Sequence, residues 1–98
     1  SFEDTLFRVG NALSETRGII RIEGHTDNQM VGFSRTFKSN FDLSAARAAS
    51  VADFLVGETN LQNGRLTISG LADTKPIGDN ETALGRAKNR RIEIYLDE

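Results

Sequence analysis

The 98-residue sequence contains no cysteine, no tryptophan, one histidine and one proline. The absence of cysteine excludes a disulfide scaffold, a thiolate metal site and a cysteine nucleophile. Twelve lysine and arginine residues stand against 14 acidic residues, so the chain lacks the basic excess that is typical of nucleic-acid-binding proteins. Its apolar runs are only a few residues long, which excludes a membrane span, and the first ten residues do not have the pattern of a signal peptide.

The composition is that of an ordinary folded domain. Hydrophobic residues make up 38% of the chain and charged residues 27%, which argues against a disordered segment. The length fits one domain that covers residues 1–98.

Apolar residues at helical spacing predict three helices. The first covers residues 2–16, where apolar side chains recur every three or four positions. A second helix follows Asn40 or Asp42, either of which can cap it, and a short third helix spans residues 82–89. The polar segment 26–41 between the first strand and the second helix has the length at which loops are usually functional.

Strict alternation of apolar and polar residues predicts three strands, at residues 19–25, 65–70 and 90–96. Alternation indicates that one sheet face is covered and the other meets water, so the helices share one side. The helix between the first two strands makes them a parallel, right-handed crossover. The sequence therefore predicts an α/β (α+β) two-layer sandwich. Three strands make a small sheet, so we expect that a further strand before residue 2 is missing. We also expect the chain to be a piece of a longer protein.

Arg47 is the most informative charged residue of the second helix. At 100° per residue it lies in the middle of the apolar stripe that Leu43, Val51 and Phe54 form. Burying a guanidinium without a partner costs several kcal/mol, so a carboxylate of the protein or of a ligand is expected nearby. The alternative is that its long stem reaches water past the helix end.

Two similar segments each place an aspartate three residues after a strand-ending glycine, at Asp27 and at Asp73. If the two strands are parallel neighbours, both carboxylates emerge at the carboxyl edge of the sheet, where open α/β sheets bind ligands. Asp27 lies beside the long loop and is interpreted as functional. Asp73 is interpreted as the cap of its own turn.

Other polar residues give weaker signals. His25 is the only histidine and points away from the apolar face of its strand, which favours a structural or rim position and no metal site. The chain has no histidine besides His25 that could activate a serine, so catalysis is not supported. Four positive charges between Arg86 and Arg91 are interpreted as a solvated helix end.

Four motifs occur together and in a fixed order: GHTDN at 24–28, FKSNFDLSAARAASV at 37–51, GLADTKP at 70–76 and GRAKNRRIEI at 85–94. As a set they resemble the OmpA-like peptidoglycan-binding domain family. Within this family the loop before the second helix is most similar to flagellar stator B subunits of the MotB and PomB type. Type VI secretion subunits of the TssL type that carry such a domain are similar as well.

The resemblance implies the OmpA-like sandwich, with a mixed sheet and helices on one face, without its usual first strand. It also implies a non-catalytic domain, with no cofactor or metal, that binds the diaminopimelate-containing stem peptide of peptidoglycan. The expected place is the periplasm of a Gram-negative bacterium, where the domain anchors a membrane protein to the cell wall and forms a homodimer.

The resemblance further implies the residues that bind the ligand, which are Thr26, Asp27, Asn40, Leu43, Ser44, Arg47 and Arg91. This agrees with the chemistry, because a zwitterion needs a carboxylate for its ammonium group and a guanidinium for its carboxylate, which Asp27 and Arg47 provide. The rival hypothesis is a structural or dimerisation module without ligand, in which Arg47 and Asp27 pair with each other.

Overall fold

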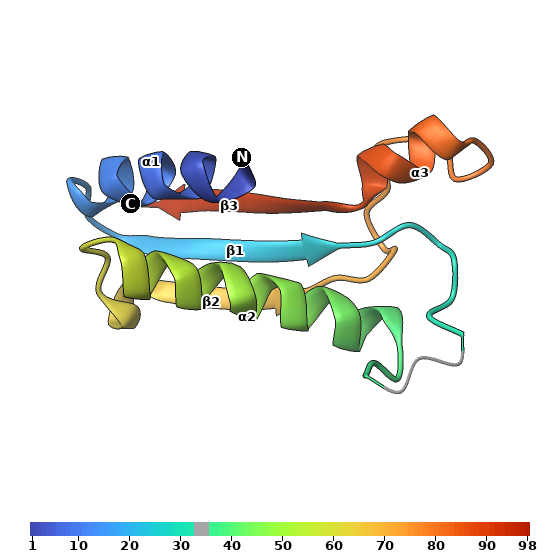
Figure 1. Cartoon of the computed structure of the whole chain (residues 1–98), viewed down its shortest axis with the longest axis horizontal. Coiled ribbons are helices and arrows are strands. Elements are labelled where there is room, and N and C mark those ends of the chain that lie inside the picture. Colours follow the sequence, from blue (N-terminus) through green and yellow to red (C-terminus); the bar gives the residue numbers. More distant parts are fainter. Residues whose placement is uncertain (33–35) are drawn as a thin grey trace.

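We describe residues 1–32 and 36–98 of the chain from a computed structural model (Figure 1). Residues 33–35, inside the predicted long loop, lie outside the described part. Along the chain the elements are α1 (Phe2–Ser14), β1 (Ile19–His25), α2 (Asn40–Glu58), the short 3₁₀ turn η1 (Asn63–Arg65), β2 (Leu66–Gly70), α3 (Ala83–Asn89) and β3 (Arg91–Asp97). The predicted helices and strands are all present. The ends of α1, β2, α3 and β3 differ from the predicted ends by one or two residues.

Hydroxyl side chains cap the starts of the helices. Ser1 caps α1 in a capping box with Asp4. Ser39 caps α2 by accepting a hydrogen bond from the backbone N–H of Asp42, so the predicted caps Asn40 and Asp42 are wrong. Ser39 has the extended backbone that a cap requires, whereas Asn40 already belongs to the helix.

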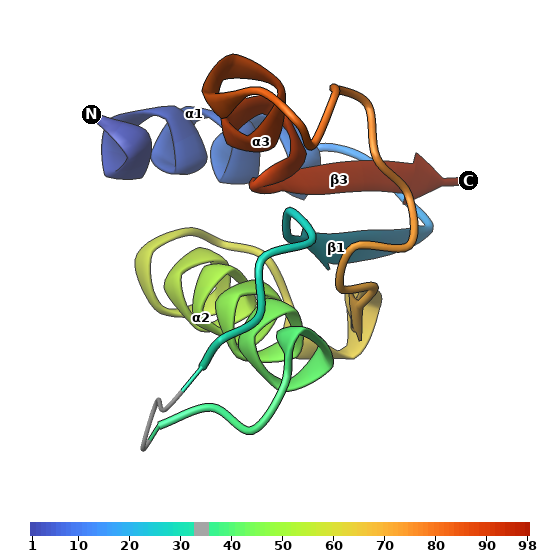
Figure 2. The ribbon, with the colours of Figure 1, turned by 90° about the vertical axis from the view of Figure 1, so that its right-hand side faces the viewer.

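The three strands form one mixed sheet in the order β2-β1-β3. β1 pairs with β2 in parallel and with β3 in antiparallel orientation, and the register places Gly24 beside Gly70 and Glu23 beside Glu93. α1 and α2 both lie on one face of this sheet, and α3 lies at one end of it (Figure 2). The predicted two-layer sandwich is confirmed.

The core lies between α2, α1 and the apolar face of the sheet. Its buried members are Leu6, Ile20, Ile22, Ala48, Val51, Leu55 and Leu61. Two apolar residues that belong to the periodic patterns of the sequence are exposed: Phe2 at the start of α1 is 59% exposed, and Ile68 on the edge strand β2 is 43% exposed. No helix within residues 1–32 and 36–98 has the length and apolar character needed to cross a membrane.

The opposite face of the sheet carries charged side chains. Arg21 donates a hydrogen bond to Glu23 at 2.8 Å, and its guanidinium lies 4.6 Å from the centre of the Tyr95 ring. Tyr95 and Arg91 both donate to the carboxylate of Glu93. These two donors hold the pKa of Glu93 below its usual range, the hydroxyl of Tyr95 having the larger effect.

Two glycines set how closely α2 approaches the strands. A Cβ atom on Gly24 would lie 2.1 Å from the backbone oxygen of Ser44, and one on Gly70 would lie 2.4 Å from the backbone nitrogen of Ala45. The helix backbone therefore rests directly on the C-terminal ends of β1 and β2. No side chain larger than a hydrogen atom fits between them.

We expect Gly24→Ala to lower the free energy of unfolding by about 2 kcal/mol or more, because the added methyl group meets backbone atoms that cannot rotate away. Gly57→Ala is the matched control, since Gly57 lies in α2 with nothing within 4 Å of its Cβ position. The control should be unchanged or stabilised by up to about 1 kcal/mol. Urea denaturation measures both, and equal stabilities would contradict the close contact.

Candidate functional site

Asp27 follows β1 directly and is 5% exposed. Its Oδ2 accepts a hydrogen bond from Nη1 of Arg90 at 2.7 Å, and its Oδ1 accepts one from the backbone N–H of Gln29 at 3.0 Å. Arg90 itself keeps 45% of its side chain exposed. The ion pair thus joins the end of β1 to the junction of α3 and β3, with the guanidinium at the surface.

Other predicted site residues hold the backbone around Asp27. The side chain of Asn40 donates to the backbone oxygen of Gln29 at 2.9 Å, which ties the start of α2 to this segment. The fully buried Ser44 accepts a hydrogen bond from the backbone N–H of Ala72 at 3.0 Å. Thr26, also buried, donates from its backbone to the oxygen of Ala72 at 2.8 Å. These residues fix the positions of three chain segments.

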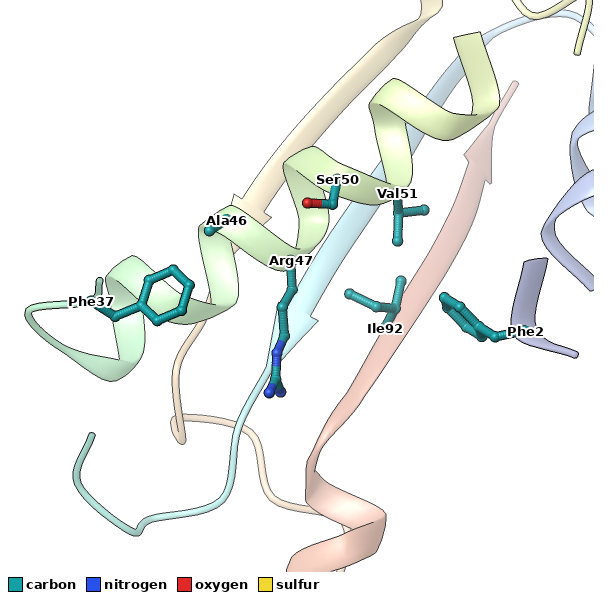
Figure 3. Close-up of a pocket in the computed structure, with 7 residues that line it drawn as sticks. All are labelled: Phe2, Phe37, Ala46, Arg47, Ser50, Val51 and Ile92. Carbon is teal, nitrogen blue, oxygen red and sulfur yellow. The ribbon is translucent and has the colours of Figure 1, made fainter. Parts of the chain in front are cut away.

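Arg47 is exposed, and no described residue forms an ion pair or a hydrogen bond with its guanidinium. It lines a cavity of about 290 Å³ between α2, α1 and β3, whose other walls are Phe2, Phe37, Ala46, Ser50, Val51 and Ile92. Its stem lies beside these apolar groups, and its guanidinium extends past the end of β1 (Figure 3). The expected buried position was therefore wrong, because the long stem carries the charge to the surface.

A neighbouring cavity of about 250 Å³ shares Arg47 with the first one. It is lined by Phe2, Arg47, Arg90, Arg91 and Ile92. Arg47 and Arg90 thus bring two guanidinium groups to this small hollow, because the guanidinium of Arg91 is bonded on the opposite face of the sheet, and Arg90 is paired with the carboxylate of the buried Asp27. Such a place attracts a carboxylate of a ligand, because guanidinium groups form strong, directional hydrogen bonds with carboxylates.

The structure separates the roles of the two consecutive arginines. Arg91, the predicted binding residue, lies on the charged face of the sheet, where its guanidinium donates to Glu93 and to the backbone oxygens of Asn89 and Lys75. Arg90, which the sequence analysis missed as a site residue, is the one that reaches Asp27. The alternation of β3 could have revealed this. Residue 91 points away from the helices, so the preceding residue 90 points to the opposite side.

Two further predictions concern residues outside the cavity walls. Leu43 is half-buried in α2 and lines neither of the two cavities. Asp73 is exposed, and no hydrogen bond from a described residue reaches its carboxylate, so the predicted cap of its own turn is not formed. That turn is closed instead by Thr74, whose hydroxyl and backbone N–H both bond to the oxygen of Leu71.

A profile of the OmpA family matches residues 2–90, so this chain belongs to the OmpA family. Its fold is similar to that of the C-terminal domain of Helicobacter pylori MotB, with a TM-score of 0.87 and 28% identity over 98% of this chain and 73% of that one. It is also similar to the cell wall anchor of the T6SS from Pseudomonas aeruginosa, with a TM-score of 0.85 and 42% identity over 95% of this chain and 64% of that one.

A curated relative is the peptidoglycan-binding protein ArfA of Mycobacterium bovis. It is 40% identical over 80% of this chain, which corresponds to 22% of the relative. Among the first curated relatives, the chain spans between 20% and 38% of their length. The similarity therefore concerns one domain of longer proteins.

Because Asp27 pairs with Arg90 and not with Arg47, we expect substitutions of these two arginines to change stability by different amounts. Arg90→Gln should lower the free energy of unfolding by about 1–2 kcal/mol, because a nearly buried carboxylate loses a charged hydrogen-bond donor. Arg47→Gln, in contrast, should change it by less than about 0.5 kcal/mol, since Arg47 is exposed and has no partner among the described residues. Chemical denaturation of the two variants checks this, and an equal or larger effect of Arg47→Gln would contradict the arrangement.

Proposed function

We propose that this domain binds peptidoglycan without catalysis, through the stem peptide that carries diaminopimelate. The observation that carries the proposal is the guanidinium of Arg47, which has no partner among the described residues and lines a cavity together with Arg90. Asp27 lines neither cavity but is bonded to Arg90, which lines the second one. Positive and negative groups thus stand close together beside an apolar hollow, as a zwitterionic ligand requires.

Each proposed contact has a chemical reason. Arg47 receives a carboxylate of the ligand, and Phe37 and Ile92 cover the methylene groups of its side chain. Asp27 receives the ammonium group, because each carboxylate oxygen has two lone-pair positions and each accepts only one hydrogen bond within the described residues. Arg90 stays beside Asp27 and adds positive charge for the same carboxylate. Thr26, Asn40 and Ser44 position the chain segments around Asp27.

The rival hypothesis of a module without ligand, in which Arg47 and Asp27 neutralise each other, is less well supported. Asp27 pairs with Arg90 and leaves the guanidinium of Arg47 available to a ligand. The printed names of relatives also favour binding, since ArfA is called a peptidoglycan-binding protein.

The parent protein is proposed to be membrane-anchored, with this domain in the periplasm of the cell envelope and forming a homodimer. A flagellar stator subunit is one candidate, supported by the likeness to MotB domains. A cell wall anchor of a T6SS is the second candidate, and the higher identity of 42% to the anchor from Pseudomonas aeruginosa favours it. In both cases the domain would fasten a larger assembly to the cell wall.

Arg47→Gln should reduce retention on purified Gram-negative sacculi at least about 10-fold, because a charged hydrogen bond to the ligand is worth about 1.5–3 kcal/mol. The matched control is Arg8→Gln, which removes an exposed arginine of α1 that lines neither cavity. Co-sedimentation measures the retained fraction, and the sacculi should be recovered undigested. Wild-type retention of Arg47→Gln would refute the role of Arg47.

Diaminopimelate carries one carboxylate more than lysine, and that group is the proposed partner of Arg47. A lysine-type stem peptide, or one whose distal carboxylate is amidated, should therefore bind about 10-fold more weakly. The factor is moderate because the guanidinium is exposed and hydrated in the free protein. Calorimetry with matched tripeptides decides the point, and equal affinities would show that the distal carboxylate is not recognised.

A further inference from the structure

A second cluster of polar side chains lies on the sheet face opposite the helices, away from the cavities of Arg47. Glu23 and His25 share this face of β1, and the antiparallel register places Glu93 of β3 directly beside Glu23. One ligand atom of each of these three residues lies within 4.8 Å of the other two. The sequence contains a single histidine and indicated no metal site, because the spacing within one strand could not show that β3 supplies a third ligand.

The state of His25 is unusual for a buried imidazole. The residue is 1% exposed, and neither ring nitrogen has a hydrogen-bond partner among the described residues. A buried polar group without a partner is costly, so a group that binds this nitrogen would stabilise the site. The Nε2 atom faces both carboxylates.

The distances fit ligands of a metal ion better than hydrogen bonds. Nε2 of His25 lies 3.5 Å from Oε1 of Glu23 and 3.9 Å from Oε2 of Glu93. A hydrogen bond between such atoms spans about 2.7–3.2 Å. Around a tetrahedral zinc ion with bonds of about 2.0–2.1 Å, ligand atoms lie roughly 3.3 Å apart. The two distances from Nε2 therefore exceed this spacing by about 0.2 and 0.6 Å, and the two carboxylate oxygens lie within 4.8 Å of each other.

The neighbouring cations hold the two carboxylates in place. Arg21 bonds to Oε2 of Glu23 at 2.8 Å and so leaves Oε1 directed toward His25. Tyr95 bonds to Oε1 of Glu93, and Arg91 bonds to Oε2, the oxygen that faces His25, so an ion would share Oε2 with Arg91 or displace it; Arg91 is also bonded to two backbone oxygens and keeps these partners. Side chains that orient metal ligands from behind are a regular part of metal sites.

We propose that Glu23, His25 and Glu93 bind one divalent transition-metal ion such as Zn²⁺. One nitrogen and two carboxylate oxygens suit zinc, and the fourth position is open to water. The ion joins β1 to the edge strand β3 on the face that no helix covers. The three proposed ligands line neither cavity of Arg47, although Arg91, which bonds to Glu93, belongs to the wall of the second one.

Calorimetric titration of chelator-stripped protein with Zn²⁺ tests the proposal. One ion per chain should bind, and Glu93→Gln should weaken binding at least 10-fold, because an amide oxygen is a poorer ligand than a carboxylate. Glu58→Gln at the exposed end of α2 is the matched control and should bind like the wild type. Circular dichroism confirms that both variants are folded. Absence of saturable 1:1 binding, or equal affinity in all three proteins, would overturn the proposal.

A measurement on the unaltered protein makes the test independent of any variant. In nitrogen-15 NMR spectra the Nε2 signal of His25 should shift on addition of one equivalent of Zn²⁺, and EDTA should reverse the shift. Since the chain has a single histidine, both imidazole signals belong to His25, and only Nδ1 and Nε2 need to be distinguished from each other. An Nε2 signal that does not change while Zn²⁺ binds would place the ion elsewhere and overturn the proposal.

Discussion

The direct contact of α2 with the ends of β1 and β2 is the constraint on which the rest of this structure depends. Gly24 and Gly70 leave room for the helix backbone itself, not only for its side chains. The start of α2 is therefore close enough for Ser44 to bond to Ala72 and for Asn40 to bond to the segment after β1. A wider gap between helix and sheet would remove both bonds and leave the loop after β1 without its supports.

This packing also explains why the charges of the site are divided between two environments. Asp27 sits at the end of a strand beneath the helix start and is buried, so it requires a permanent partner, which Arg90 supplies. Arg47 leaves the same helix one turn after Ser44 and extends beyond the strand end into an open hollow. The protein thereby stabilises its own carboxylate and still presents guanidinium groups to a ligand.

Much of this could be predicted from the sequence, because alternation and helical spacing report which face of an element is buried. The order of elements, the parallel pairing of β1 with β2 and the placement of both long helices on one face followed from these patterns, whereas the mixed sheet was expected only from the family resemblance. Pairings between distant segments could not be predicted, since spacing within one element says nothing about its neighbour. For this reason Arg90 was missed as the partner of Asp27, and the position of Glu93 beside His25 was not foreseen. The exposure of Ile68 could not be predicted either, because nothing in its own strand indicates that the strand lies at an edge of the sheet.

The central claim is that one zwitterionic end of a stem peptide is held between Asp27 and Arg47. A crystal structure of the domain with a soluble diaminopimelate-containing tripeptide tests it most directly. The account predicts a ligand carboxylate at hydrogen-bond distance, about 3 Å, from the guanidinium of Arg47, and the ligand ammonium at a similar distance from the carboxylate of Asp27. A peptide bound elsewhere on the domain, or bound in the cavity with neither contact, would contradict the claim.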